Sequence, residues 1–128
     1  MKKIEVTAAV IQYKEKIRAA QRGYGEFKGR WEFPGGKLEY GETAREALIR
    51  ECKEELSIEL SVGDLLDIVE YDYTNFHLSM YCFLCEIKSG QLTMKEHDAI
   101  KWIRKEQMKD LEWLPADKYF LRKIGWIQ

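Results

Sequence analysis

A sharp break at Pro34-Gly35-Gly36 is the feature that most constrains how this chain can fold. The residues before it, Trp31 to Phe33, favour a short strand, and proline followed by glycine ends a strand. After the polar sequence Gly41-Glu42-Thr43, apolar residues recur at spacings of three and four, which predicts a helix. These residues are Ala44, Ala47, Leu48, Cys52 and Leu56. The chain must therefore pass from a strand into an amphipathic helix within a few residues.

Strands are expected on both sides of this helix. The predicted strands are 4–13, 17–21, 60–73, 76–87 and 99–103, with turns at Lys14-Glu15-Lys16, Thr74-Asn75 and Ser89-Gly90. A short helix is predicted over 105–111, and Pro115 opens a last helix that reaches Lys123. The order of strands, helix, strands and helix predicts an α+β fold or a mixed sheet between helices. With 128 residues and no linker or repeat, residues 1–128 are expected to form one domain.

The charge balance excludes some classes of partner. Lys and Arg total 21 and Asp and Glu total 22, so the formal net charge is −1. Such a chain lacks the basic excess that binds a nucleic acid polymer. No apolar run approaches the roughly 18 residues of a membrane span, and Glu5 and Thr7 interrupt the N-terminal apolar stretch. We therefore expect a cytoplasmic protein without membrane association.

The three cysteines, Cys52, Cys82 and Cys85, lack the pattern of a disulfide framework and fit a reducing compartment. Two residues separate Cys82 from Cys85, as in some zinc sites. Both lie in a predicted strand, however, where positions three apart face opposite sides of a sheet. Because no second pair is nearby, we expect no zinc or redox site here.

Three glutamates gather on one side of the first predicted helix. Glu51, Glu54 and Glu55 fall within an arc of roughly 100° and flank the apolar stripe. Like charges at this spacing repel, and negative charge near a helix C-terminus is unfavourable. A bound cation would neutralise the cluster, and all-oxygen ligands suit Mg²⁺ or Mn²⁺. The acids alone also fit a solvated helix face, balanced by the neighbouring bases Arg45, Arg50 and Lys53.

Gly35-Gly36-Lys37 precedes this helix and adds a second signal. Paired glycines allow a ligand to approach the backbone closely, and lysine supplies a point charge suited to phosphate. By itself the same sequence also fits a tight turn with an exposed lysine. Only its position beside the acidic helix favours a ligand site.

Together these residues resemble the Nudix box. The family pattern is Gly, five residues, Glu, seven residues, Arg-Glu, an aliphatic residue, any residue, Glu-Glu, any residue, Gly and an aliphatic residue. Here Gly36, Glu42, Arg50-Glu51 and Glu54-Glu55 match at the correct spacing. Cys52 replaces an aliphatic residue, and Ser57 replaces the glycine that favours a left-handed helix end. Neither departure touches the charged positions.

The resemblance extends beyond the box, to the MutT and CTP pyrophosphohydrolase group of the family. It is carried by the segments Ala20-Gln21-Arg22, Trp31 to Lys37, Glu96-His97 and Leu114 to Asp117. The implied fold is the Nudix α/β/α sandwich with a mixed central sheet. The implied reaction is attack of water on a nucleoside triphosphate, giving pyrophosphate and a nucleoside monophosphate.

The resemblance also implies roles for the matching residues. The metal, Mg²⁺ or Mn²⁺ in its place, would be held by Glu51, Glu54, Glu55, Glu96 and the carbonyl group of Gly35. Arg50 would orient the ligating glutamates, while Gly36 and Glu42 would support the box. The identity of the general base varies within the family, and we rank Glu54 first, followed by Glu51 and Glu96.

Substrate contacts are implied at a further set of residues. Arg22 and Lys37 would contact phosphates, and Asp117 would read the edge of the base. Asp117 also fits a structural role, since an acid is favourable in the first turn of a helix. Pocket-lining residues would be Phe33, Tyr73, His77 and Met80, although such residues on strands commonly belong to a core.

The residues leave the substrate and assembly open. An oxidised purine triphosphate such as 8-oxo-dGTP and a cytosine triphosphate, either CTP or a modified dCTP, both fit. Alternatives are hydrolysis of another nucleoside diphosphate derivative, such as a dinucleoside polyphosphate, and a nucleotide-binding Nudix module without catalysis. The protein is expected to be a monomer or a homodimer.

Overall fold

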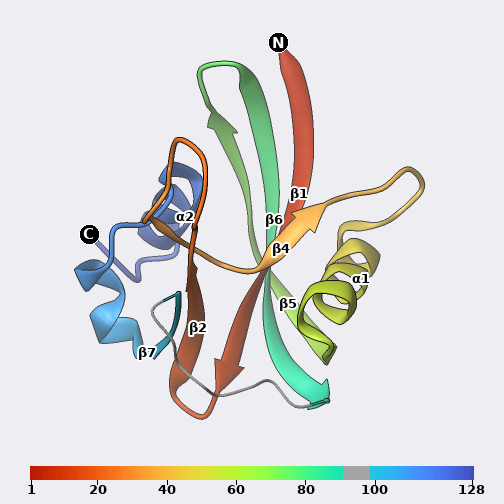
Figure 1. The fold of residues 1–128 in the computed structure, drawn as a ribbon, viewed down its shortest axis with the longest axis vertical. Helices are drawn as coiled ribbons and strands as arrows, with labels where there is room; N and C mark the ends of the chain where they lie inside the picture. Colours follow the sequence, from red (N-terminus) through yellow and green to blue (C-terminus); the bar gives the residue numbers. More distant parts are fainter. Residues whose placement is uncertain (91–98) are drawn as a thin grey trace.

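The computed structural model describes residues 1–90 and 99–128 and is drawn in Figure 1. The strands are β1 (Lys2–Tyr13), β2 (Lys16–Gln21), β3 (Trp31–Glu32), β4 (Gly35–Lys37), β5 (Glu59–Asp72), β6 (Phe76–Ser89) and β7 (Ile100–Ile103). The helices are α1 (Ala44–Leu56), the 3₁₀-helix η1 (Lys105–Asp110) and α2 (Pro115–Lys123). Within the described residues, no helix is long and apolar enough to cross a bilayer.

The described strands form one mixed sheet in the order β3-β2-β1-β6-β5, with β4 on β1 and β7 on β2. Strand β1 runs parallel to β6, whereas its pairings with β2 and β4 are antiparallel. Strand β1 thus holds the sheet together: its first part pairs with β6, and its last two residues pair with β2. This arrangement confirms the mixed sheet expected from the sequence.

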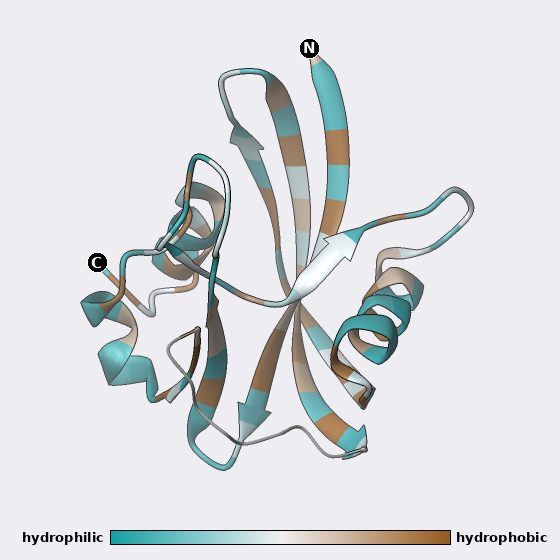
Figure 2. Cartoon of the chain, viewed as in Figure 1, coloured by the Kyte–Doolittle hydropathy of each residue, from teal (hydrophilic) through white to brown (hydrophobic). Residues whose placement is uncertain are grey.

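The sheet has a hydrophobic core on each face. Hydrophilic and hydrophobic residues alternate in the first half of β1 in Figure 2, whereas the following residues Ala8 to Ile11 are all apolar and buried. Ala8 and Val10 belong to the core that also contains residues of α2, while Ala9 and Ile11 belong to the core that contains residues of α1. Figure 1 shows α1 and α2 on opposite sides of the sheet. The fold is therefore the α/β/α sandwich that the resemblance implied.

The alternation also confirms the expectation for the cysteines. Cys82 lies in the core beside α2, and Cys85 lies in the core beneath α1. All three cysteines are buried free thiols, and burial raises the pKa of Cys85 to about 12. The pair therefore shares no site.

Helix α1 begins with a reciprocal capping box. The Thr43 side chain accepts a hydrogen bond from the Glu46 backbone N–H at 3.1 Å, and the Glu46 carboxylate accepts one from the Thr43 N–H at 2.9 Å. The helix ends at Ser57, whose φ of 54° lies in the left-handed region. Ser57 thus occupies the backbone conformation for which glycine is preferred.

One expectation requires correction. Gly35-Gly36-Lys37 is not a turn but strand β4, which pairs with Val6 to Ala8 of β1. A side chain at Gly35 would overlap the Thr7 carbonyl oxygen, so only glycine permits this close pairing. The short helix predicted over 105–111 is confirmed and is the 3₁₀-helix η1. The sequence did not indicate the irregular register of β5 between Val62 and Asp67.

The left-handed Ser57 gives a test of the helix end. Replacing Ser57 with glycine should raise the free energy of unfolding by about 0.5 kcal/mol, because relief of backbone strain exceeds the added entropy of the unfolded chain. Urea unfolding measures this change. Ser61→Gly, at an exposed position in β5, is the matched control and should lower the same free energy. A Ser57→Gly variant as unstable as the control would contradict the assignment of strain.

Candidate active site

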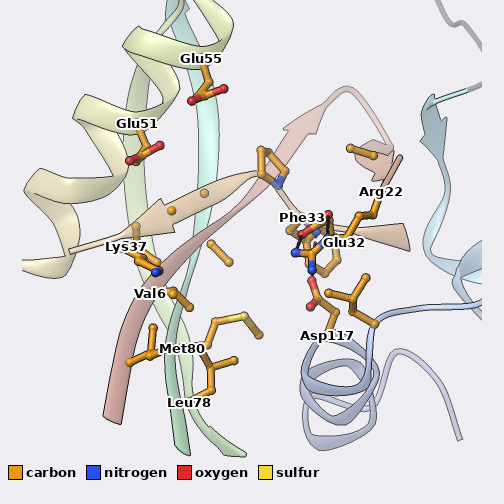
Figure 3. Close-up of a pocket in the computed structure, with 18 of the residues that line it drawn as sticks. Val6, Arg22, Glu32, Phe33, Lys37, Glu51, Glu55, Leu78, Met80 and Asp117 are labelled. Atoms are coloured by element: carbon orange, nitrogen blue, oxygen red, sulfur yellow. Dashed lines mark hydrogen bonds and ion pairs between the residues drawn. The ribbon is translucent and has the colours of Figure 1, made fainter. Parts of the chain in front are cut away.

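A cavity of about 540 Å³ lies between the sheet, α1 and the first turn of α2. It brings together ten of the residues predicted from the sequence: Arg22, Phe33, Gly35, Gly36, Lys37, Glu51, Glu55, Tyr73, Met80 and Asp117. Figure 3 shows Glu51 and Glu55 on one side of the cavity and Arg22, Phe33 and Asp117 on the other. The predicted residues Glu42, Arg50, Glu54 and His77 do not line it, and Glu96 lies outside the described residues.

Glu51 and Glu55 lie one turn apart on α1, so their carboxylates reach the same cavity. The two glycines of β4, Gly35 and Gly36, line the same cavity and carry no side chain. A side chain at Gly36 would come within 2.6 Å of Glu51 Oε2, which no ordinary contact tolerates. Gly36 therefore leaves the space that the Glu51 carboxylate occupies.

Arg50 holds the segment before α1 against the helix. Its guanidinium donates to Glu42 at 2.7 and 2.9 Å, to Glu51 Oε1 at 3.0 Å and to the Lys37 carbonyl oxygen at 3.1 Å. The bond with Arg50 lowers the pKa of Glu42, and the carboxylates of Glu42 and Glu51 raise the pKa of Arg50. Arg50 thus contacts the glutamates and stays out of the cavity.

Glu54 points away from the cavity. Its side chain is 61% exposed, and one carboxylate oxygen lies 3.3 Å from Arg50 Nη1. The structure therefore brings Glu51 and Glu55 to the cavity but not Glu54, the residue ranked first from the sequence as general base. Helical spacing predicted that Glu51, Glu54 and Glu55 lie within one arc of α1. Glu54 lies at the edge of that arc, beside Arg50.

Asp117 lies at the other side of the cavity, in the first turn of α2. It is only 5% exposed, and its Oδ2 accepts a hydrogen bond from the Phe33 backbone N–H at 3.0 Å. Burial raises the pKa of Asp117 to about 7, and the Phe33 bond opposes this shift. Near neutral pH this side chain can therefore either donate or accept a hydrogen bond.

Aromatic rings surround Asp117. Phe33 stacks on Trp113 with a centroid distance of 4.9 Å, and Tyr73 stacks on Phe76 at 5.0 Å. The Tyr73 hydroxyl accepts a hydrogen bond from the Ala116 backbone N–H at 3.0 Å. Phe33 and Tyr73 therefore belong to both the wall of the cavity and the packing of α2.

The two predicted phosphate-binding cations differ in their surroundings. Arg22 forms a bidentate pair with Glu32, with N···O distances of 2.8 and 2.9 Å. The Lys37 ammonium has no ion pair within residues 1–90 and 99–128. Much of the Arg22 charge is thus already balanced, whereas that of Lys37 is available.

The predicted pocket role of His77 is not supported, because its side chain lies on the other face of β6. It sits between Asp72 and Glu70, with N···O distances of 2.6 and 3.0 Å, and these two carboxylates raise its pKa. From the same strand, the predicted Met80 does line the cavity, together with Phe76 and Leu78. Strand alternation could have excluded His77, since it cannot share a face with Met80.

Sequence reasoning also missed Arg18, which lines the cavity from β2 and is 6% exposed. Strand alternation could have identified Arg18, because it lies two and four residues before Ala20 and Arg22, which line the same cavity. A lone arginine in a strand commonly faces solvent, so its burial could not be read from the sequence.

The donor groups at the Glu51 side of the cavity fit a hard divalent cation. Magnesium is commonly held by one or two carboxylates, with water and substrate phosphates completing the shell. Glu51, Glu55 and the backbone of Gly35 and Gly36 offer such a partial set of oxygen ligands. In the part of the chain that the structure describes, no three His, Cys, Asp or Glu side chains converge into a complete protein cage.

Comparison with known proteins identifies the family of this chain. The NUDIX domain model matches residues 1–124. A CTP pyrophosphohydrolase of Escherichia coli is 37% identical over 91% of this chain and 87% of its own length. An 8-oxo-dGTP diphosphatase of Proteus vulgaris is 40% identical over 74% of this chain and 87% of its own.

Solved structures give the same result. The solution structure of a MutT protein from methicillin-resistant Staphylococcus aureus is 37% identical and covers 97% of each chain with a TM-score of 0.75. The matched region spans every element that builds the cavity. With the fold, the box residues and these relatives in agreement, the chain belongs to the Nudix family.

Proposed function

We propose that this protein is a MutT-like, magnesium-dependent nucleoside triphosphate pyrophosphohydrolase. Water would attack the triphosphate, and the products would be a nucleoside monophosphate and pyrophosphate. The observation that carries this proposal is one cavity that joins the carboxylates of Glu51 and Glu55 to a buried acid, Asp117, on the opposite side. Such a cavity can hold a polyphosphate at one end and a base at the other.

The names of the relatives support two substrate classes. One relative is named a CTP pyrophosphohydrolase and others are named 8-oxo-dGTP diphosphatases. We therefore propose that the substrate is a cytosine triphosphate or an oxidised purine triphosphate. Asp117 would read the base edge, since it can accept from an amino group when ionised and donate to a carbonyl group when protonated.

Nudix hydrolases generally use a divalent metal ion. For this chain we propose Mg²⁺, with Mn²⁺ as a substitute, held by Glu51, Glu55 and the Gly35 carbonyl, with Glu54 and Glu96 as further ligands. When bound, the ion would neutralise phosphate charge and favour ionisation of water. Lys37 would bind a phosphate as a point charge, and Arg22 would do so only in part because Glu32 already pairs with it.

The geometry favours Glu51 over Glu54 as the general base. Glu51 lines the cavity, and its bond from Arg50 fixes the orientation of its carboxylate. A general base must come within hydrogen-bond reach of the attacking water, which an exposed Glu54 does not do from its present position. Arg50 would act by positioning Glu51, and Glu42 would hold Arg50.

The remaining assignments belong to the same proposal. The whole chain, 1–128, would act as one domain, since β1 at its start and α2 at its end both line the cavity. The three buried free thiols support a cytoplasmic location.

Turnover of a nucleotide panel tests the function. The purified protein with Mg²⁺ should release pyrophosphate from one triphosphate class among ordinary nucleotides, 8-oxo-dGTP and modified dCTP. ADP-ribose and a dinucleoside tetraphosphate complete the panel. Glu51→Gln should lower kcat by about 10²-fold or more, because the amide cannot accept a proton.

Glu86→Gln, at an exposed position in β6, is the control and should keep wild-type turnover. Glu54→Gln and Glu55→Gln complete the series, and unchanged turnover of Glu54→Gln would remove that residue from the mechanism. A folded protein that binds nucleotides without turnover would instead be a non-catalytic Nudix module. Preference for the dinucleoside tetraphosphate would replace the proposed substrate class.

The close approach of the Glu51 carboxylate to Gly36 allows a separate test of the carboxylate position. In Gly36→Ala the new methyl group should displace the flexible end of Glu51 and leave the backbone in place. We expect about tenfold weaker Mn²⁺ binding, measured from the electron paramagnetic resonance signal of free Mn²⁺. The free energy of unfolding should change by less than about 1 kcal/mol. Gly23→Ala, which has open space around it, should change neither quantity; equal Mn²⁺ affinity of both variants would contradict this arrangement.

The buried Asp117 predicts a pH dependence of stability. The folded state keeps the Asp117 proton up to about pH 7, whereas the unfolded chain loses it near pH 4. Between these values the folded state binds more protons, so this residue's contribution to stability falls as pH rises. Asp117→Asn lacks this titration, so its stability relative to wild type should increase by up to about 1.4 kcal/mol per pH unit in that window.

Urea unfolding across this pH range measures the effect. The exposed Asp64→Asn variant is the control and should follow the wild-type pH profile. A constant difference between Asp117→Asn and wild type from pH 4 to pH 7 would show that Asp117 titrates like an ordinary aspartate.

A further inference from the structure

Arg18 is a buried charge with no partner in the described part of the chain. Arg18 is only 6% exposed, and its Nε–H has no hydrogen-bond acceptor. Burial lowers the pKa of its guanidinium, which is the direction expected when the charged form loses water. Burying the Nε of a guanidinium without an acceptor is unfavourable. The position therefore favours an anion that comes from outside the chain.

The cavity is the place from which such an anion can come. Arg18 lines it together with Glu51 and Glu55, yet forms no ion pair with either carboxylate. Cys52 of α1 lines the same cavity beside Arg18, and burial raises the pKa of its thiol to about 12, so Cys52 supplies no negative charge near pH 7. The guanidinium is therefore not used to neutralise the acids that would hold a metal.

Strand geometry places Arg18 far from the base end. At about 3.3 Å per residue, its Cα lies about 13 Å along β2 from that of Arg22. Arg22 is on the Asp117 side of the cavity, next to Phe33. Arg18 instead faces α1 near Cys52, the neighbour of Glu51 in the chain. An anion at Arg18 would thus lie on the α1 side of the cavity, away from Asp117.

We propose that Arg18 is a further substrate-binding residue, which holds the two phosphates that leave as pyrophosphate. This role rests on the proposed function. A guanidinium binds phosphate through two parallel N–H···O bonds, a geometry that the ammonium of lysine cannot supply. The site would distinguish triphosphates from monophosphates, because only the former carry phosphates to this end of the cavity.

Binding of inorganic pyrophosphate with Mg²⁺ tests this role by isothermal titration calorimetry on the full chain. Arg18→Met removes the charge and keeps a long side chain, and it should weaken pyrophosphate binding by about tenfold or more. Arg18→Lys should recover part of the loss. CMP and GMP should bind each variant within about twofold of wild type. The Tm without ligand should stay unchanged or rise, because an unpaired buried charge has been removed.

Lys16→Met is the matched control, since it removes an exposed positive charge from the same strand and should change none of these values. Wild-type pyrophosphate affinity in Arg18→Met would overturn the role of Arg18. An equal loss for pyrophosphate and monophosphates would also overturn it, because a distorted cavity would explain both. Pyrophosphate binding that depends on Arg18, in a protein that hydrolyses no nucleotide of the panel, would overturn the proposed function and leave this site standing.

Discussion

The cluster of hydrogen bonds around Arg50 is the interaction on which the arrangement of the site depends. A single guanidinium joins the end of β4, the segment before α1 and the helix itself through Lys37, Glu42 and Glu51. Bidentate bonds between a guanidinium and a carboxylate fix orientation as well as distance. Because the segment 38–43 contains no regular structure, these bonds set where α1 begins relative to the sheet. The position of Glu51 in the cavity follows from this placement of α1 against the sheet.

The placement of α1 against the sheet also requires two positions without a side chain, Gly35 and Gly36. Gly35 lets β4 lie directly against Thr7 of β1, and Gly36 leaves room for the Glu51 carboxylate. A larger residue at the first position would push the strand away, whereas one at the second would move only the acid. The pair of glycines thus serves two different purposes, one in the sheet and one in the site. Their role is close approach, since neither has a positive φ.

The parts of the fold that could be predicted from sequence are those set by local pattern. The apolar spacing after Gly41-Glu42-Thr43 predicted α1, and strand alternation placed Cys82 and Cys85 on opposite faces of the sheet, in separate cores. Strand β4 could not be predicted, because glycine is a poor strand former and only the approach of β1 explains its pairing. For the site, helical spacing predicted a group of acids but not that Arg50 would hold Glu54 outside the cavity.

Burial of charge is the property that sequence patterns describe least well, and here it concentrates in the cavity. Asp117 at one end and Arg18 at the other are both nearly inaccessible, and each is costly to the folded state in its charged form. A chain selected for stability alone would place apolar residues at both positions. Local departures of this kind are expected where a structure serves binding. The sign of each charge suits one end of a nucleotide, with a positive group for phosphates and an acid that can share a proton with a base. Under the roles proposed for these two residues, a nucleoside triphosphate would lie with its phosphates toward Arg18 and its base toward Asp117.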